Sequence, residues 1–122
     1  MPRAPMDYPG SLGAERRQQQ RKALRANAEL LLQGAPPIPV RTLDISIGGI
    51  GVVSGLNLPQ SAPCVIRLAA PGQSRGVPTI RIDAIIMHSI FTIRHDGFMI
   101  GLRFGDDLSP EAVEAVTKYL SG

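Results

Sequence analysis

The sequence is poor in cysteine, in aromatic residues and in long apolar runs. Cys64 is its only cysteine, which excludes an intrachain disulfide. Tryptophan is absent, and three Phe and two Tyr residues leave most of a core to Ile, Val, Leu and Ala. No apolar run is long enough for a transmembrane helix, and residues 1–14 are polar and proline-rich rather than signal-like. These features predict a cytoplasmic protein without a transmembrane segment.

Residue patterns typical of catalysis are also missing. Asp44, Ser46 and either His88 or His95 could formally supply a hydrolase triad, but nothing marks a nucleophile elbow. The two histidines and Cys64 do not have the paired spacing of metal ligands. Neither a dinucleotide-binding fingerprint nor the Gly-Lys-Ser/Thr ending of a phosphate loop is found. The sequence therefore predicts a protein that is not an enzyme and has no cofactor or metal.

The apolar residues follow a pattern of short strands. Glycine (13 residues) and proline (11 residues) are frequent, which suits turns between strands in a single domain of 122 residues. Residues 23–32 are ambiguous, because their composition favours a helix and their alternation favours a strand. A mainly β fold, a small antiparallel barrel, is predicted from strands at residues 38–45, 50–54, 64–68, 79–92 and 98–104.

The later strands and the C-terminus carry more specific signals. In residues 79–92, alternation predicts that His88 shares one face with Ile80, Ile82, Ala84 and Ile86. Asp96-Gly97 predicts a hairpin turn. A helix is expected over residues 109–121, since Ser109 can cap it and Pro110 suits its first position. Its apolar stripe comprises Ala112, Val113, Val116 and Leu120.

Positive charge is concentrated near the N-terminus. The formal net charge is +3, yet residues 1–25 alone carry +4 and the rest of the chain carries −1. A basic, polar segment of this kind is typical of an arm that captures an anion, although such segments are more often solvated linkers.

A turn at residues 44–49 separates two of the predicted strands. Asp44 and Ser46 can bond local backbone N–H groups, as in any β-turn. Gly48 and Gly49 can adopt a positive φ and let another group approach the backbone closely. Taken alone, the segment is compatible with a structural turn and nothing more.

The basic segment and the turn together resemble the PilZ domain family, small bacterial receptors for cyclic di-GMP. The Arg-x-x-x-Arg motif of that family matches Arg17 and Arg21, and its Asp/Asn-x-Ser-x-x-Gly motif matches Asp44, Ser46 and Gly49. Arg21 and Arg25 also fit the first motif, but Arg17 and Arg21 give the family's distance to the first strand. The resemblance also includes the late hairpin and the C-terminal helix, and it extends from about residue 15 to residue 120.

The resemblance implies a six-stranded PilZ-like β-barrel with a C-terminal helix and a flexible N-terminal arm. It implies a disordered tail at residues 1–14 and a domain at residues 15–122, with a ligand-binding arm at residues 15–22. The expected ligand is cyclic di-GMP, since Arg forks bind phosphates and guanine edges and a carboxylate accepts guanine N–H groups. The implied ligand-binding residues are Arg16, Arg17, Arg21, Asp44, Ser46, Gly48 and Gly49.

The family also implies how such a receptor acts. Ligand would order the arm, and the ordered arm would change contact with an unidentified effector protein in motility, exopolysaccharide or pilus control. In the family, an Arg at the position of Arg16 often accompanies binding of two stacked ligand molecules.

Two other functions compete with this prediction. Some PilZ members lack the motif arginines and act as protein–protein interaction modules without nucleotide binding. A basic arm on a small barrel could also bind single-stranded nucleic acid. The scarcity of aromatics and the slightly negative remainder of the chain argue against the latter, so no nucleic-acid partner is predicted.

Overall fold

The computed structural model describes residues 20–122. The tail predicted at residues 1–14 and most of the predicted arm, including Arg16 and Arg17, lie outside the described residues. Near the start of the described residues, a short strand, β2 (Lys22–Ala23), pairs with β4 (Ile38–Ile45) of the barrel.

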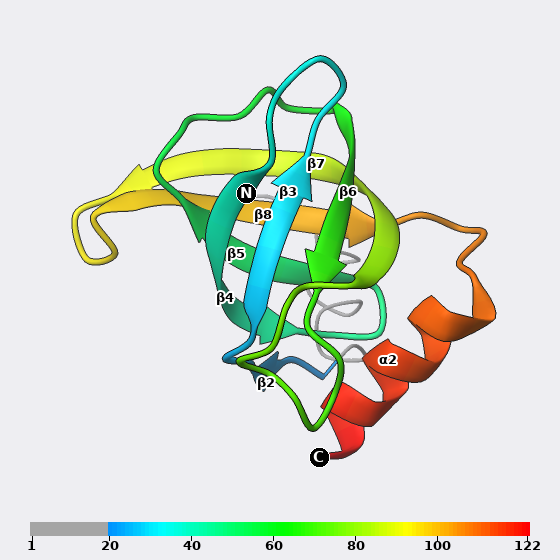
Figure 1. Cartoon of the computed structure of the whole chain (residues 1–122). Coiled ribbons are helices and arrows are strands. Elements are labelled where there is room, and N and C mark those ends of the chain that lie inside the picture. Colours follow the sequence, from blue (N-terminus) through cyan, green and yellow to red (C-terminus); the bar gives the residue numbers. More distant parts are fainter. Residues whose placement is uncertain (1–19) are drawn as a thin grey trace, which may run out of the picture.

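Six antiparallel strands close into a barrel (Figure 1). Each strand pairs with the next around the ring β4-β3-β6-β7-β8-β5, and pairing of β5 with β4 closes it. β2 is a seventh strand attached to β4 outside the ring. The barrel and the helix predicted from the sequence are confirmed. The strands are β3 (Asn27–Leu31), β4 (Ile38–Ile45), β5 (Gly49–Ser54), β6 (Pro63–Leu68), β7 (Ile80–Thr92) and β8 (Gly97–Phe104).

The core is aliphatic, as the scarcity of aromatics requires. Alternate residues of each strand point inward, so that the ambiguous segment 27–31 buries Ala28 and Leu30 as a strand. The fully buried large side chains inside the barrel are Leu30, Ile45, Ile50, Ile66, Leu68, Ile82, Ile86 and Ile100. Burial of this aliphatic surface is the main force holding the ring closed.

The helix α2 (Pro110–Ser121) packs against β7 and β4 at one side of the barrel (Figure 1). Ser109 Oγ accepts a hydrogen bond from the Ala112 N–H at 3.1 Å, which satisfies one unpaired donor of the first turn. The predicted apolar stripe was partly wrong, because Val113 is half exposed and Ala115 is buried in its place. Small alanines at positions 112 and 115 let the helix lie close to the strands.

The predicted face of β7 holds only as far as Ile86. A β-bulge interrupts the register with β8 between Ile86 and His88, so that Met87 is an extra residue. Because strand side chains alternate with a period of two, one extra residue moves the side chains after it to the opposite face of the strand. His88 is therefore exposed outside the barrel, and its predicted place beside Ile86 was wrong.

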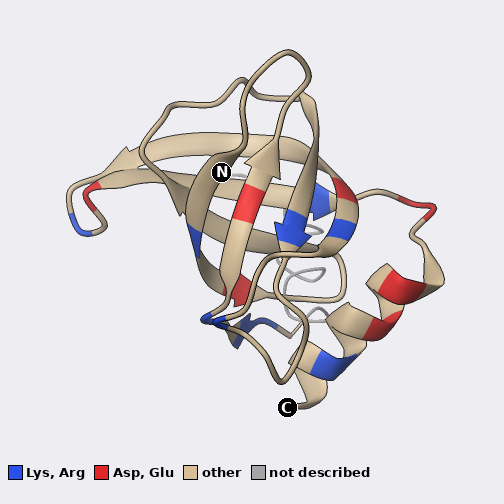
Figure 2. Ribbon diagram, viewed as in Figure 1, with Lys and Arg blue, Asp and Glu red and all other residues tan. Residues whose placement is uncertain are grey.

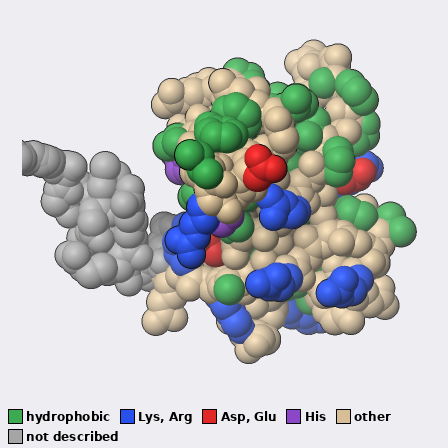
Figure 3. Space-filling model, turned by 90° about the vertical axis from the view of Figure 1, so that its left-hand side faces the viewer, with side chains coloured by type: hydrophobic (Ala, Val, Ile, Leu, Met, Phe, Trp, Pro, Cys, Tyr) green, Lys and Arg blue, Asp and Glu red, His purple; other side chains and the backbone are tan. Residues whose placement is uncertain are grey.

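The β7–β8 hairpin projects from the barrel beyond the end of β6 (Figure 1). Its exposed hydrophobic residues are Ile90, Phe91 and Ile93, and hydrophobic side chains gather on this side of the molecule (Figure 3). The predicted turn is present, but Asp96 rather than Gly97 has the positive φ, at 51°. A Cβ at Gly97 would lie 2.9 Å from the Ser54 carbonyl oxygen, so glycine here permits close approach of β5.

Between β2 and β3 the chain leaves β4, and Thr42 fills the gap. Its buried hydroxyl accepts a hydrogen bond from the Ala26 N–H and donates one to the Leu24 carbonyl oxygen, both at 2.9 Å. This side chain replaces the backbone pairing that residues 24–26 would otherwise make with β4. On the neighbouring strands, the acidic position of β3 lies beside the basic position of β6 (Figure 2), where Glu29 and Arg67 form an ion pair.

Candidate functional site

Arg21 joins the two sequence motifs in space. Its Nη2 lies 2.8 Å from Asp44 Oδ1, and its Nη1 donates to Ser46 Oγ at 3.4 Å. β2 sets this geometry, because Lys22 pairs with Ile45 and Ala23 pairs with Asp44. The pairing of the short strand β2 with β4 therefore brings Arg21 to Asp44 and Ser46, which are 23 and 25 positions away in the sequence.

Ser46 is completely buried and shapes the turn between β4 and β5. Its backbone N–H donates to the Gly49 carbonyl oxygen at 2.8 Å, and its hydroxyl lies 3.4 Å from the same oxygen. Ser46 thus has the structural role expected of a turn residue and also presents its Oγ to Arg21. These two roles are compatible, since a hydroxyl can donate one hydrogen bond while accepting others.

Glycines near the turn are required by close neighbours rather than by backbone conformation. Neither Gly48 nor Gly49 has a positive φ. A Cβ at Gly49 would lie 2.3 Å from the Leu102 carbonyl oxygen of β8. A Cβ at Gly51 would lie 2.7 Å from Asp44 Oδ1, so the absence of a side chain there leaves room for the Arg21–Asp44 pair. Sequence reasoning did not single out Gly51.

Arg21, Asp44, Gly48, Gly49 and Gly51 line a hollow of about 480 Å³ on the outside of the barrel, whereas the buried Ser46 lies behind this lining. Arg21, Asp44, Gly48 and Gly49 form one wall. The opposite side was missed by sequence reasoning, and it comprises Met87, His88, Met99 and Arg103. The hollow combines cations, a carboxylate and soft apolar side chains, which suits an organic anion with hydrogen-bonding edges.

His88 reaches this hollow because of the bulge and because residue 101 is glycine. Its ring lies directly over Gly101, where an added Cβ would be 2.2 Å from the ring. The signal available in the sequence was the pair of glycines facing outward on adjacent strands, Gly51 and Gly101, which are partners across β5 and β8.

The remaining titratable groups give no alternative site. Burial raises the pKa of the Cys64 thiol to about 11, and the nearby charge of Asp83 adds to the shift, so the thiol is protonated and unreactive at neutral pH. Within residues 20–122, no group of three or more His, Cys, Asp and Glu residues could hold a metal ion. None of the described helices has the length and apolar character needed to span a bilayer.

A family model for the PilZ domain matches residues 15–122 of the sequence. The chain belongs to the PilZ domain family. The match includes both motifs, the complete barrel and the C-terminal helix, and it confirms the resemblance noted from the motifs. A search of curated proteins found no match.

Solved structures show the same PilZ fold at low sequence identity. The PilZ domain of YcgR from Escherichia coli, with c-di-GMP, is 18% identical with a TM-score of 0.60, over 87% of this chain and 90% of that one. MotI/DgrA, an inhibitor of motility from Bacillus subtilis, is 19% identical with a TM-score of 0.67, over 85% of this chain. PlzA from Borreliella burgdorferi, in complex with c-di-GMP, is 17% identical with a TM-score of 0.62, over 89% of this chain. This PilZ chain spans 49% of MotI and 43% of PlzA, about half the length of each.

Proposed function

We propose that this PilZ chain is a non-enzymatic cytoplasmic receptor for cyclic di-GMP. The observation that carries the proposal is the contact of Arg21 with Asp44 and Ser46, which unites the two ligand-binding motifs of the family. Two of the structurally similar proteins, YcgR and PlzA, have been solved with c-di-GMP. Arg16 and Arg17, which precede the described residues, complete the proposed site together with Gly48 and Gly49.

The chemistry of the hollow matches the ligand's two kinds of polar group. Cyclic di-GMP presents phosphates and the O6/N7 edges of guanine as acceptors, and Arg17 and Arg21 can bind either with two parallel hydrogen bonds. The opposite guanine edge presents N–H donors, which the Asp44 carboxylate accepts. The buried Ser46 hydroxyl accepts a hydrogen bond from Arg21 and so helps to position that side chain for the ligand. The glycines keep the wall of the hollow open to the ligand.

Binding can use Arg21 even though it is already paired with Asp44. The two side chains are 45% and 37% exposed, so theirs is a surface ion pair. Such pairs contribute only about 0.2–1 kcal/mol. A charge-assisted hydrogen bond to the ligand contributes about 1.5–3 kcal/mol, so ligand contacts can replace the pair with a net gain. Without ligand, the pair keeps both side chains near their bound positions.

We further propose that ligand binding orders the part of the arm (residues 15–22) that precedes Arg21, and so changes contact with an effector protein. The motivating observation is the net charge of +4 in residues 1–25. Motility is the first process to examine, because MotI is an inhibitor of motility; exopolysaccharide and pilus control are further possibilities from the family. Limited proteolysis tests the ordering. Cleavage near Arg17 should slow with saturating ligand, and equal cleavage rates with and without it would refute the switch.

Calorimetric titration tests the receptor itself. Cyclic di-GMP should bind wild type with a Kd near micromolar or tighter. Arg17→Ala/Arg21→Ala should weaken binding by at least about 100-fold, because two charge-assisted contacts are lost. Arg81→Ala/Arg94→Ala is the matched control, since both arginines are exposed and neither lines the hollow. If wild type shows no binding, the chain is an interaction module without a nucleotide ligand.

The same titration gives the stoichiometry. We propose that Arg16 supplies an additional cationic plane for a second stacked ligand molecule. Wild type should then bind two ligands per chain and Arg16→Ala should bind one. A stoichiometry of one in wild type would contradict this role for Arg16 and leave the rest of the proposed site unaffected.

A further inference from the structure

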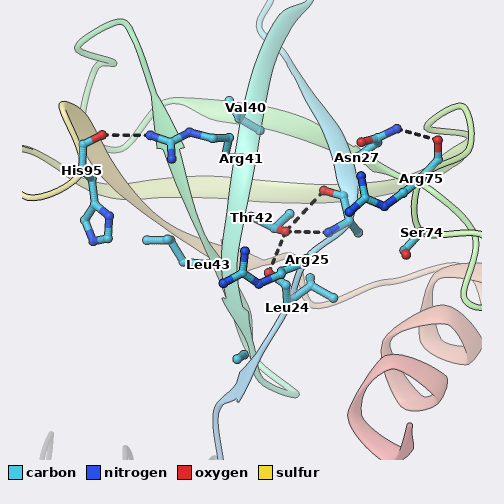
Figure 4. Close-up of a pocket in the computed structure, with 12 residues that line it drawn as sticks. Leu24, Arg25, Asn27, Val40, Arg41, Thr42, Leu43, Ser74, Arg75 and His95 are labelled. Carbon is cyan, nitrogen blue, oxygen red and sulfur yellow. Dashed lines mark hydrogen bonds between the residues drawn. The ribbon is translucent and has the colours of Figure 1, made fainter.

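A second hollow, of about 460 Å³, lies on the other side of Leu43 from the proposed cyclic di-GMP site. It forms where residues 24–26 leave β4, so that Thr42 rather than a neighbouring strand completes the backbone hydrogen bonding. The loop after β6 provides one end through Ser74 and Arg75, and the hairpin turn provides the other through His95 (Figure 4).

Three arginines line this hollow. Arg25, Arg41 and Arg75 line it together with His95, and its lining includes no Asp or Glu. Within residues 20–122, none of the three arginines forms an ion pair. The three guanidinium groups are exposed and carry like charge, so an anion placed between them would neutralise charge and reduce their mutual repulsion.

The nearby carboxylates do not provide that neutralisation. Asp44 is paired with Arg21 and Glu29 is paired with Arg67. Asp96 shares a separate small hollow with Arg41 on the far side of β4, and the two do not form an ion pair.

The backbone beneath the arginines is held in place. The Asn27 side chain donates hydrogen bonds to the Arg75 carbonyl oxygen at 2.8 Å and to the Gly76 carbonyl oxygen at 3.1 Å. Arg41 Nη2 donates to the His95 carbonyl oxygen at 2.8 Å, which directs this guanidinium toward the hairpin turn (Figure 4). Arg25 projects from between the two ends, beside Thr42 (Figure 4). The fixed backbone at residues 75–76 and the held Arg41 side chain reduce the entropy lost on binding.

We propose that this second hollow is a binding site for a small phosphate-bearing organic anion of about mononucleotide size. Arginine forks match phosphate oxygens with two parallel hydrogen bonds, and three of them suit a group with more than one negative charge. The cavity volume falls within the range of about 300–1,000 Å³ typical of small-molecule sites. Ala23, Ala26 and Leu43, which line the hollow and are only partly buried or exposed, supply apolar wall for the organic part. The site uses none of the residues assigned above to cyclic di-GMP and does not depend on the function proposed above.

An NMR titration of backbone amides tests the site, with pyrophosphate and GMP as probes. Both probes should shift amides at residues 23–27, 41–43, 74–76 and 95. Arg41→Ala/Arg75→Ala should weaken probe binding by at least about tenfold. Arg81→Ala, an exposed strand arginine outside both hollows, should leave it unchanged. Shifts confined to residues 44–51 and 99–103, or unchanged affinity in the double variant, would overturn the proposal.

Two comparisons separate this site from the cyclic di-GMP site. Arg21→Ala should retain pyrophosphate binding and weaken cyclic di-GMP binding by at least about tenfold, whereas Arg41→Ala/Arg75→Ala should show the reverse. If cyclic di-GMP fails to bind wild type, the pyrophosphate titration still decides the second site. Binding of an oligoglutamate peptide with no binding of either phosphate probe would also overturn the proposal, because it would identify a surface for acidic proteins.

Discussion

At the scale of single residues, the space left by glycines determines the proposed binding site. Gly51 lies under the Asp44 carboxylate and Gly101 lies under the His88 ring. A side chain at either position would displace a group that lines the hollow. Neither residue has a positive φ, so their importance comes from neighbours on the outer surface of the barrel.

Gly51→Ala should weaken cyclic di-GMP binding while leaving the fold intact. The new Cβ would lie 2.7 Å from Asp44 Oδ1, and the end of that side chain can move away, which separates it from Arg21. Loss of one well-placed charged contact predicts a fall in affinity of at least about tenfold.

Calorimetry measures this effect, and thermal unfolding checks the fold. Gly55→Ala is the control, because an added Cβ there meets nothing within 4 Å. Equal affinities for the Gly51→Ala and Gly55→Ala variants would contradict the importance of the space at residue 51.

Cys64 predicts a specific dependence of stability on pH. Burial, with a smaller effect from Asp83, raises the pKa of its thiol from 9.0 to about 11 in the folded chain. The protonated thiol's contribution to the free energy of unfolding is therefore fully present below pH 9. It is lost as the pH rises from 9 toward 11, because the thiol then ionises in the unfolded chain before it ionises in the folded one. A difference of two pH units corresponds to about 2–3 kcal/mol.

Denaturant unfolding of wild type and Cys64→Ala between pH 8 and pH 11 measures this contribution. The free energy of unfolding of wild type should fall more steeply above pH 9 than that of the variant, with the two curves parallel below pH 9. Parallel curves over the whole interval would show that the thiol titrates alike in both states.

At the scale of elements, Thr42 holds the short strand β2 and the following segment onto β4. Its hydroxyl satisfies the Ala26 N–H and the Leu24 carbonyl oxygen, which have left the regular ladder. The same segment carries Arg21 to Asp44 and Arg25 to the second hollow. One buried hydroxyl therefore supports both proposed sites.

Thr42→Val should lower the free energy of unfolding by about 1–3 kcal/mol, because it leaves the buried Leu24 carbonyl oxygen and the partly buried Ala26 N–H without partners. The shape of the side chain is retained, so the effect isolates the hydroxyl. Thr117→Val is the control on the exposed face of α2, where Thr117 Oγ1 donates to the Val113 carbonyl oxygen. Surface substitutions of that kind change the free energy of unfolding by no more than about 0.5 kcal/mol. Similar losses for the two variants would refute the role assigned to Thr42.

Most elements could be predicted from the sequence because their patterns are local. The strand at residues 38–45 and the helix capped by Ser109 have the predicted bounds within one residue. Residues 27–31 could not be assigned to a helix or a strand, because the local sequence fits both. Pairing with the neighbouring strands β4 and β6 makes them a strand. The bulge at Met87 was missed because no glycine or proline marks it, and the error placed His88 on the wrong face.

At the scale of the whole molecule, closure of the barrel brings distant segments to two adjacent hollows. Arg21, Asp44, Gly48 and Gly49, which lie within the two family motifs, line the same hollow because pairing of β2 with β4 brings the two motifs together. The opposite wall, from β7 and β8, depends on register across the ring and could not be predicted from local patterns. The second hollow likewise combines β4, a loop and a hairpin turn.

The contrast between Arg21 and Arg25 tests the central claim most directly. Both are exposed arginines of one segment and both fit the Arg-x-x-x-Arg spacing, yet only Arg21 contacts Asp44. Calorimetric titration of cyclic di-GMP into Arg21→Ala and Arg25→Ala should show a loss of at least about tenfold for Arg21→Ala. Arg25→Ala should bind like wild type. A larger loss for Arg25→Ala, or no binding by wild type, would contradict the proposed receptor site.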